Sequence, residues 1–87
     1  MNKYTISYDL LKPGQNYEGL IARLKQHGAE RVLLSQWALR TTWTAAQLRD
    51  DLEAYMDSND RLLVARLTGE WASLNLLAAV KFKQIAA

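Results

Sequence analysis

The apolar pattern changes side near the middle of this chain, and no other feature constrains its fold as strongly. Val32 and Leu34 occupy even positions, whereas Trp37 and Leu39 occupy odd ones. Because strand side chains alternate between two faces, a continuous strand would turn one of these sets toward water. We therefore predict a bulge or a tight reversal near residues 35–36, which gives either one kinked strand or two short ones.

A strand and a helix precede this segment. Residues 3–9 alternate as a strand does, with aromatic and β-branched side chains throughout. Pro13 and Gly14 predict a turn after it. Apolar residues then recur at helical spacing, in a helix that Asn16 can cap and Gly28 can end.

A second helix and a strand follow the split segment. Thr44 and Gln47 have the spacing of a capping box, which predicts the start of the second helix. Residues 61–68 read as a strand that is apolar on both faces, which suits the middle of a sheet or a dimer contact. The tail, residues 70–87, fits a short final helix, or alternatively a last strand added to a partner's sheet.

This order of elements is that of a ferredoxin-like α+β fold, βαββαβ, in which both helices cover one face of an antiparallel sheet. The 87 residues suffice for one hydrophobic core, so residues 1–87 are expected to form a single domain. The other face of the sheet would be left open. We expect a second copy of the chain to cover it in a homodimer.

Composition narrows the choice of partners and location. Eleven basic and nine acidic residues give a net charge of +2, far from the basic excess that marks nucleic-acid binders. The absence of cysteine excludes disulfides and thiolate metal sites and suits a reducing compartment. No apolar run reaches the ~18 residues that a membrane span needs, and the first residues resemble a strand rather than a signal peptide. We expect a cytoplasmic protein.

Several short motifs resemble those of one family. Tyr8-Asp9 resembles its Tyr-Asp-Ile at the end of the first strand. Residues 31–38, Arg-Val-Leu-Leu-Ser-Gln-Trp-Ala, resemble its Arg-Val-Gln-x-Ser-Val-Phe-Glu, and residues 60–64 resemble the strand after its second helix. The chain is thus similar to the CRISPR-associated protein two family of the spacer-acquisition complex and to stand-alone relatives near virulence-associated protein D.

The resemblance implies a dimeric, nucleic-acid-associated protein that acts as a metal-dependent endonuclease on RNA or DNA. It implies that Asp9 is the catalytic residue and the ligand of Mg²⁺ or Mn²⁺ at the dimer axis, since hard dications prefer carboxylate oxygens. The alternative is that Asp9 caps the turn after the strand. Lys12, Arg31 and Arg40 are candidate phosphate contacts, or else ordinary solubilising charges.

The sequence departs from the family motif at Leu33, Gln36 and Ala38, where glutamine, valine and glutamate are expected. The missing glutamate favours a second hypothesis with the same fold. In it the chain is a non-catalytic homodimeric interaction module or a component of a toxin–antitoxin type.

Other candidate groups favour structural roles. His27 lies at a helix end, where capping or solvation is expected rather than base catalysis. Asp50, Asp51 and Glu53 lack the spacing of a calcium loop and are expected on a solvated helix face. Trp37 is expected in the core, although a tryptophan can also stack on bases.

Overall fold

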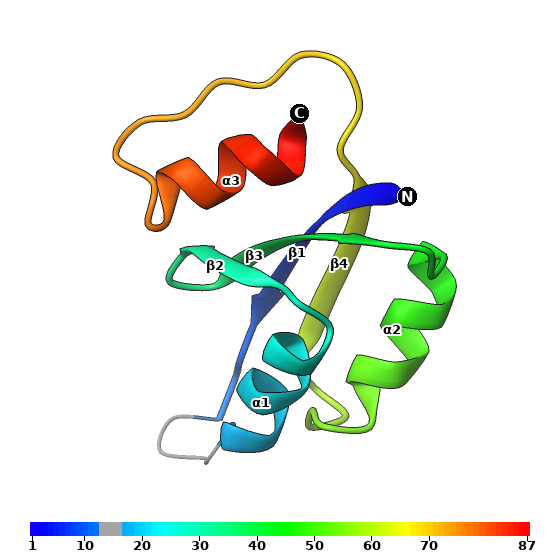
Figure 1. Ribbon diagram of the computed structural model, residues 1–87. Coiled ribbons are helices and arrows are strands. Elements are labelled where there is room, and N and C mark those ends of the chain that lie inside the picture. The colour runs from blue at the N-terminus through cyan, green and yellow to red at the C-terminus, as the bar shows by residue number, and fades with distance from the viewer. Residues whose placement is uncertain (13–16) are drawn as a thin grey trace.

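The computed structural model describes residues 1–12 and 17–87, which form a small α+β protein with a four-stranded antiparallel sheet and three helices (Figure 1). The elements follow the chain in this order: β1 (Asn2–Asp9), α1 (Glu18–Gln26), β2 (Glu30–Leu33), β3 (Gln36–Thr41), α2 (Ala45–Glu53), β4 (Arg61–Arg66) and α3 (Ala79–Ala86). In space the strands lie in the order β2-β3-β1-β4. The expected Pro13–Gly14 turn and Asn16 cap lie outside the described residues.

The predicted reversal near residues 35–36 is confirmed, and it separates two strands. Leu34 and Ser35 form the turn between β2 and β3, which pair in antiparallel fashion. The two apolar sets face different layers, because Trp37 packs beneath α1 and α2 whereas Val32 packs against α3. The pattern changes side because the sheet has an apolar cluster on each face.

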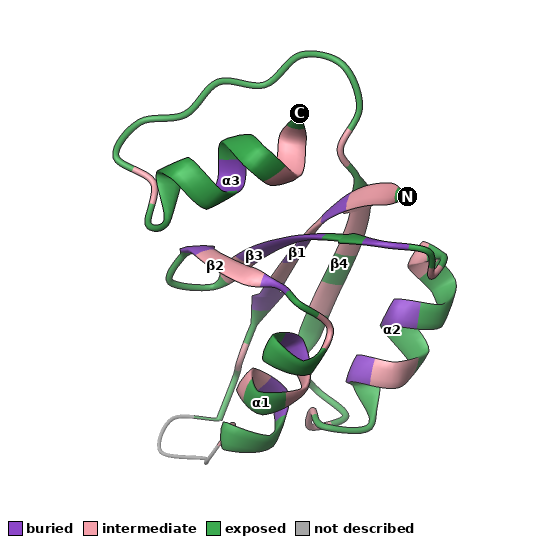
Figure 2. Ribbon diagram, viewed as in Figure 1, coloured by how far each residue is buried: buried purple, intermediate pink, exposed green. Residues whose placement is uncertain are grey.

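The main core lies between the sheet and the helices α1 and α2, and we call this side the helix face. Figure 2 shows the buried residues on β1, β3 and the inner sides of these helices. The fully or nearly fully buried members are Tyr4, Ile6, Tyr8, Leu20, Leu24, Ala29, Trp37, Leu39, Leu48 and Leu52. The alternation of β1 and the helical stripes, both visible in the sequence, therefore meet in one cluster.

The predicted signals at the helix ends are confirmed. Gly28 has a φ of +81°, and the backbone N–H groups of Gly28 and Ala29 donate to the carbonyls of Lys25 and Leu24 after the last turn of α1. At the start of α2, the Thr44 hydroxyl accepts from the backbone N–H of Gln47 over 3.1 Å. The side chain of that glutamine accepts in return from the backbone N–H of Thr44 over 2.9 Å.

The face opposite the helix face, which we call the second face, is not bare as expected. The C-terminal helix α3 lies against β2 and β3 (Figure 1). Phe82 packs there on Val32 and Ala38. The expected short final helix is present, but it begins only at Ala79, and residues 70–78 are irregular. The cluster around Phe82 covers the second face over β2 and β3, and the part over β1 and β4 lies outside it.

Strand β4 lies at the edge of the sheet, not in its middle. Leu62 and Val64 point toward the helix face yet are only half-buried, and Leu63 on the second face is 63% exposed. A strand that is apolar on both faces is therefore incompletely covered in the single chain.

Candidate functional site

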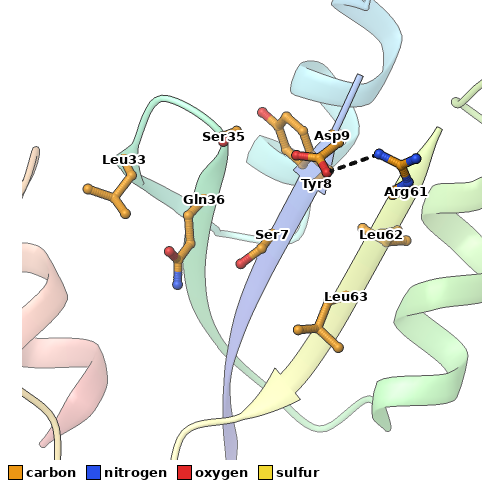
Figure 3. A pocket seen from close by; sticks show the side chains of 9 residues that line it. All are labelled: Ser7, Tyr8, Asp9, Leu33, Ser35, Gln36, Arg61, Leu62 and Leu63. Carbon is orange, nitrogen blue, oxygen red and sulfur yellow. Dashed lines mark ion pairs between the residues drawn. The ribbon is translucent and has the colours of Figure 1, made fainter. Parts of the chain in front are cut away.

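A hollow of about 270 Å³ opens on the second face where β1 ends (Figure 3). Strand pairing assembles it: β1 sets Ser7 beside Gln36 of β3 and beside Leu63 of β4, and it sets Asp9 beside Arg61. The residues around it, which we call the β1-end hollow, are Ser7, Tyr8, Asp9, Leu33, Ser35, Gln36, Arg61, Leu62 and Leu63. Of the four candidate site residues, Asp9 alone lines this hollow.

Asp9 lies at the open rim of the β1-end hollow. Its Oδ2 atom is 3.7 Å from Nη1 of Arg61, and the two side chains are 65% and 71% exposed. An exposed ion pair at this distance contributes little stability, so the carboxylate is held loosely. The rim thus offers one carboxylate, one guanidinium and the polar side chains of Ser7 and Gln36.

Another aspartate holds the turn after β1. The Asp60 carboxylate accepts hydrogen bonds from the backbone N–H of Leu11 over 2.8 Å and from the Tyr17 hydroxyl over 3.0 Å. It also accepts from the backbone N–H of Asp57 over 2.8 Å. In the described part of that turn, the backbone N–H of Leu11 is thus capped by Asp60 and not by Asp9. The sequence marks Asp60 only as the last residue of an Asp-Ser-Asn-Asp turn.

Lys12 is engaged away from the hollow. Its Nζ atom lies 3.0 Å from Oδ1 of Asp57 in the loop that precedes β4. The lysine ammonium holds the pKa of Asp57 below its ordinary value, helped by a hydrogen bond from the Asn59 backbone. A charge held by its own carboxylate is less available to a phosphate.

Arg31 is engaged on the helix face. Its guanidinium carbon lies 4.9 Å from the centroid of the Trp37 ring, and Nη2 is 3.5 Å from the Tyr8 hydroxyl. Among the described residues, its Nε atom is buried without a hydrogen-bond partner. The guanidinium therefore takes part in the packing of β2 on β3 through its contacts with Trp37 and Tyr8.

Arg40 lies at the far end of the sheet. Its strand neighbour on β1 is Lys3, six residues from Asp9, which corresponds to about 20 Å along a strand. Arg40 donates to the Ala87 carbonyl over 3.0 Å, and Lys3 donates to the Ala86 carbonyl over 2.9 Å. These two cations anchor the end of α3. The structure does not bring Lys12, Arg31 and Arg40 together around Asp9.

The β1-end hollow offers a magnesium or manganese ion one carboxylate, that of Asp9. Within residues 1–12 and 17–87, no group of three or more histidine, aspartate or glutamate side chains could hold a metal ion. Asp9 is the carboxylate that lines the hollow, and its neighbour Arg61 repels a dication. Among the described residues, the metal that the resemblance implies would thus meet one carboxylate beside one guanidinium in this hollow.

The sequence did not predict a charged cluster that joins α1 to α2. Arg23 donates to both carboxylate oxygens of Asp51, over 2.7 and 2.9 Å, and Nε2 of His27 lies 2.7 Å from Oδ2 of the same carboxylate. The His27 side chain is only 8% exposed, and its ring makes a T-shaped contact with the ring of Trp43, with centroids 4.8 Å apart. The expectation of a solvated Asp51 is wrong.

The cluster has a structural character. The Arg23 guanidinium holds the pKa of Asp51 below its ordinary value against the opposing effect of burial, and His27 adds to the effect. Arg23 and His27 are four residues apart on one side of α1, which was the available sequence signal. Because its hydrogen bonds join α1 to α2, we assign the cluster to holding the two helices together.

None of the helices in the described part of the chain has the length and apolar character that a membrane span requires. No family model matches the chain, and no solved structure matches it.

Proposed function

We propose that this protein is a homodimeric interaction module with a ferredoxin-like fold. The fold assignment is supported by the order β1, α1, β2, β3, α2, β4, and by the position of β3 between β1 and β2 and of β1 between β3 and β4. The helix α3 is an addition on the second face. A cytoplasmic location is part of the same proposal.

The single observation that carries the proposal is the incomplete cover of β4. Leu63 is 63% exposed in the middle of this edge strand, and Leu62 and Val64 stay half-buried although they point toward the core. Open edges with apolar side chains are where sheets pair with another chain. A second copy would supply the missing cover.

The arrangement of the basic residues favours the module over the nuclease. Lys12 is paired with Asp57, Arg31 lies on Trp37, and Arg40 holds the end of the chain about 20 Å from Asp9. A phosphate backbone needs cations along one continuous path. These three do not form such a path.

The mass of the particle in solution tests the proposal. Light scattering at micromolar concentration should report twice the 9.9 kDa of the chain. Leu63→Glu should shift the particle toward the monomer, because it places a carboxylate on the open edge strand. Leu34→Glu is the matched control at a leucine exposed on the β2–β3 turn, and it should stay dimeric. A monomeric wild-type protein would refute the proposal.

A second candidate is the metal-dependent nuclease acting on RNA or DNA, and one observation favours it. The Asp9 carboxylate is exposed at the rim of an open hollow and is only loosely held. If two copies brought their Asp9 carboxylates together, they would repel one another and a divalent cation would be needed to join them.

Asp9→Asn separates the two candidates, because it keeps the shape and removes the charge. For the interaction module we expect no cleavage of RNA or DNA and no rise of the melting temperature with millimolar Mg²⁺ or Mn²⁺, in wild type and variant alike. Asp50→Asn is the control, at another exposed aspartate that pairs with an arginine. Metal-dependent cleavage that Asp9→Asn abolishes and Asp50→Asn retains would establish the nuclease instead.

A further inference from the structure

The outer edge of β4 has a defined set of free backbone groups. The Leu67 N–H donates to the Lys3 carbonyl over 2.8 Å, so odd-numbered residues on this strand direct their backbone groups toward β1. Tyr8 donates to Ser35 on the other side, which fits the same alternation on β1. The N–H and C=O groups of Leu62, Val64 and Arg66 therefore point away from the sheet.

We propose that two copies join through antiparallel pairing of β4 with its own copy, with Leu63 facing the partner's Leu63 on the two-fold axis. The inference rests on the proposed homodimer and names its contact. It places the interface at the edge of the sheet rather than on the open face expected from the sequence.

The open part of the second face is a poor alternative contact. On β1 it carries Thr5 and Ser7, because Tyr4, Ile6 and Tyr8 point to the helix face. The apolar half of the second face is already covered by α3. An edge contact instead uses the free backbone groups together with the apolar residues of β4.

Backbone geometry restricts the register of such a pair. In an antiparallel pair, two directly opposed residues either both point their backbone groups at the other strand or both point them away from it. Since this property alternates along β4, an even-numbered residue must face an even-numbered one, and an odd one an odd one. In a symmetric dimer one residue must therefore face its own copy, and residues 63 and 64 are nearest to the centre of the strand.

The side chains favour Leu63 over Val64 at the axis. With Leu63 there, Leu62 faces the partner's Val64 and exchanges both backbone hydrogen bonds with it, and Arg61 faces a small alanine. Arg66 then lies opposite the partner's Asp60, whose carboxylate accepts hydrogen bonds within its own chain and still makes this a pair of opposite charge. With Val64 at the axis, Arg66 would face an apolar leucine, the partner's Leu62, and this charge pairing would be lost.

The pairing has a consequence for Asp9. It puts three inter-strand spacings, about 14 Å, between β1 and its symmetry mate. The two Asp9 carboxylates then cannot hold one metal ion, so this dimer and a nuclease centred on paired Asp9 residues exclude each other.

Single cysteines test the register, because the chain has no cysteine of its own. Leu63 and its copy form a non-hydrogen-bonded pair, whose Cβ atoms approach to about 4.5–5.5 Å, near the span of a disulfide. Under mild oxidation, Leu63→Cys should form a disulfide-linked dimer on a non-reducing gel. Ser7→Cys, on the open face beside Leu63, and Val64→Cys should remain largely unlinked.

A proline variant tests the edge independently. The Val64 N–H points outward, so Val64→Pro removes a hydrogen bond of the interface but none of the β1–β4 ladder. Val64→Pro should be a folded monomer by light scattering and circular dichroism. Val64→Ala, which also shortens the side chain but keeps the backbone N–H, should remain dimeric.

The outcomes separate this inference from the proposed function. A dimer that links through Ser7→Cys or Val64→Cys, or that fails to link through Leu63→Cys, would overturn the β4 register and leave the homodimer standing. A dimeric Val64→Pro variant would overturn the edge contact. A wild-type monomer would overturn the homodimer itself.

Discussion

The indole N–H of Trp37 donates a hydrogen bond to the hydroxyl of Tyr8 over 2.9 Å, and both residues are buried. The bond crosses from β3 to β1 directly beneath the β1-end hollow, since Tyr8 precedes Asp9. A buried indole N–H or phenol without a partner is costly, so the pair fixes how the two strands meet at this end of the sheet.

Trp37→Ala should lower the free energy of unfolding by about 3–5 kcal/mol, because a large aromatic side chain leaves the core. Trp37→Phe keeps most of the packing but removes the donor to Tyr8, and should cost about 1–2 kcal/mol. Urea unfolding measures both. A loss below about 1 kcal/mol for Trp37→Ala, typical of a surface site, would contradict the placement of β3.

The Arg23–Asp51 pair should make stability depend on pH in acid. The folded pKa of Asp51 lies below its ordinary value, so its contribution is present above the pKa of the unfolded chain and is lost as pH falls through the folded pKa. Melting temperatures between pH 6 and pH 2 should fall less steeply in Asp51→Asn than in wild type. Since the pKa values of Asp57 and Asp60 are also lowered, some acid sensitivity should remain in the variant. If the melting temperatures of the two proteins fell in parallel with pH, the stabilising role of the Arg23–Asp51 pair would be contradicted.

Phe82→Ala should release α3 from the second face. Phe82 is the buried residue of that helix, and it contacts Val32 and Ala38 and makes a T-shaped contact with the Trp71 ring. Hydrogen exchange should show loss of protection in residues 79–86 while α1 and α2 keep theirs, because the main core lies on the other side of the sheet. Leu74→Ala, at an exposed leucine of the same tail, is the control and should leave exchange unchanged.

Gly28→Ala should destabilise the protein by about 1–2 kcal/mol, because Gly28 has a φ of +81° and an L-residue is strained there. A Cβ atom at this position meets nothing within 4 Å, so the cost is one of backbone conformation and not of a clash. Gly28→Asn should cost less, since asparagine tolerates the left-handed region better. Thermal unfolding of the two variants measures the difference. Equal losses of stability in the two variants would indicate that the left-handed conformation at Gly28 is not the cause.

Local signals in the sequence predicted most elements of the fold correctly. The capping box at Thr44, the left-handed stop at Gly28 and the reversal near residues 35–36 each depend on neighbours in the chain, and each is confirmed. The features that local signals do not determine, the position of β4 and the cover of the second face, depend on the sheet as a whole. The apolar residues of β4 imply cover on both faces and suit either the middle of a sheet or a dimer contact, and alternation does not say whether that cover comes from the same chain.

The candidate site was predicted less well for the same reason. Asp9 lies at the end of β1 as expected, but its neighbour Arg61 comes from a strand distant in sequence, and strand pairing alone puts them together. The sequence places the carboxylate of Asp51 on a solvated face of its helix, because it lies outside the apolar stripe. Its partners lie on another helix, and the approach of α1 to α2 is a tertiary contact that no local pattern shows.

The central position of β1 bears on how the chain acquires its structure. The first strand of this sheet along the chain, β1, pairs on one side with β3 and on the other with β4, the last strand of the sheet. The β2–β3 hairpin can form locally, but β1 must wait for distant segments, and such non-local closure slows folding. On the ribosome, residues 1–9 would remain an unpaired, aromatic-rich strand until β3 emerges, so β1 is where a stalled or truncated chain is most exposed to misassociation.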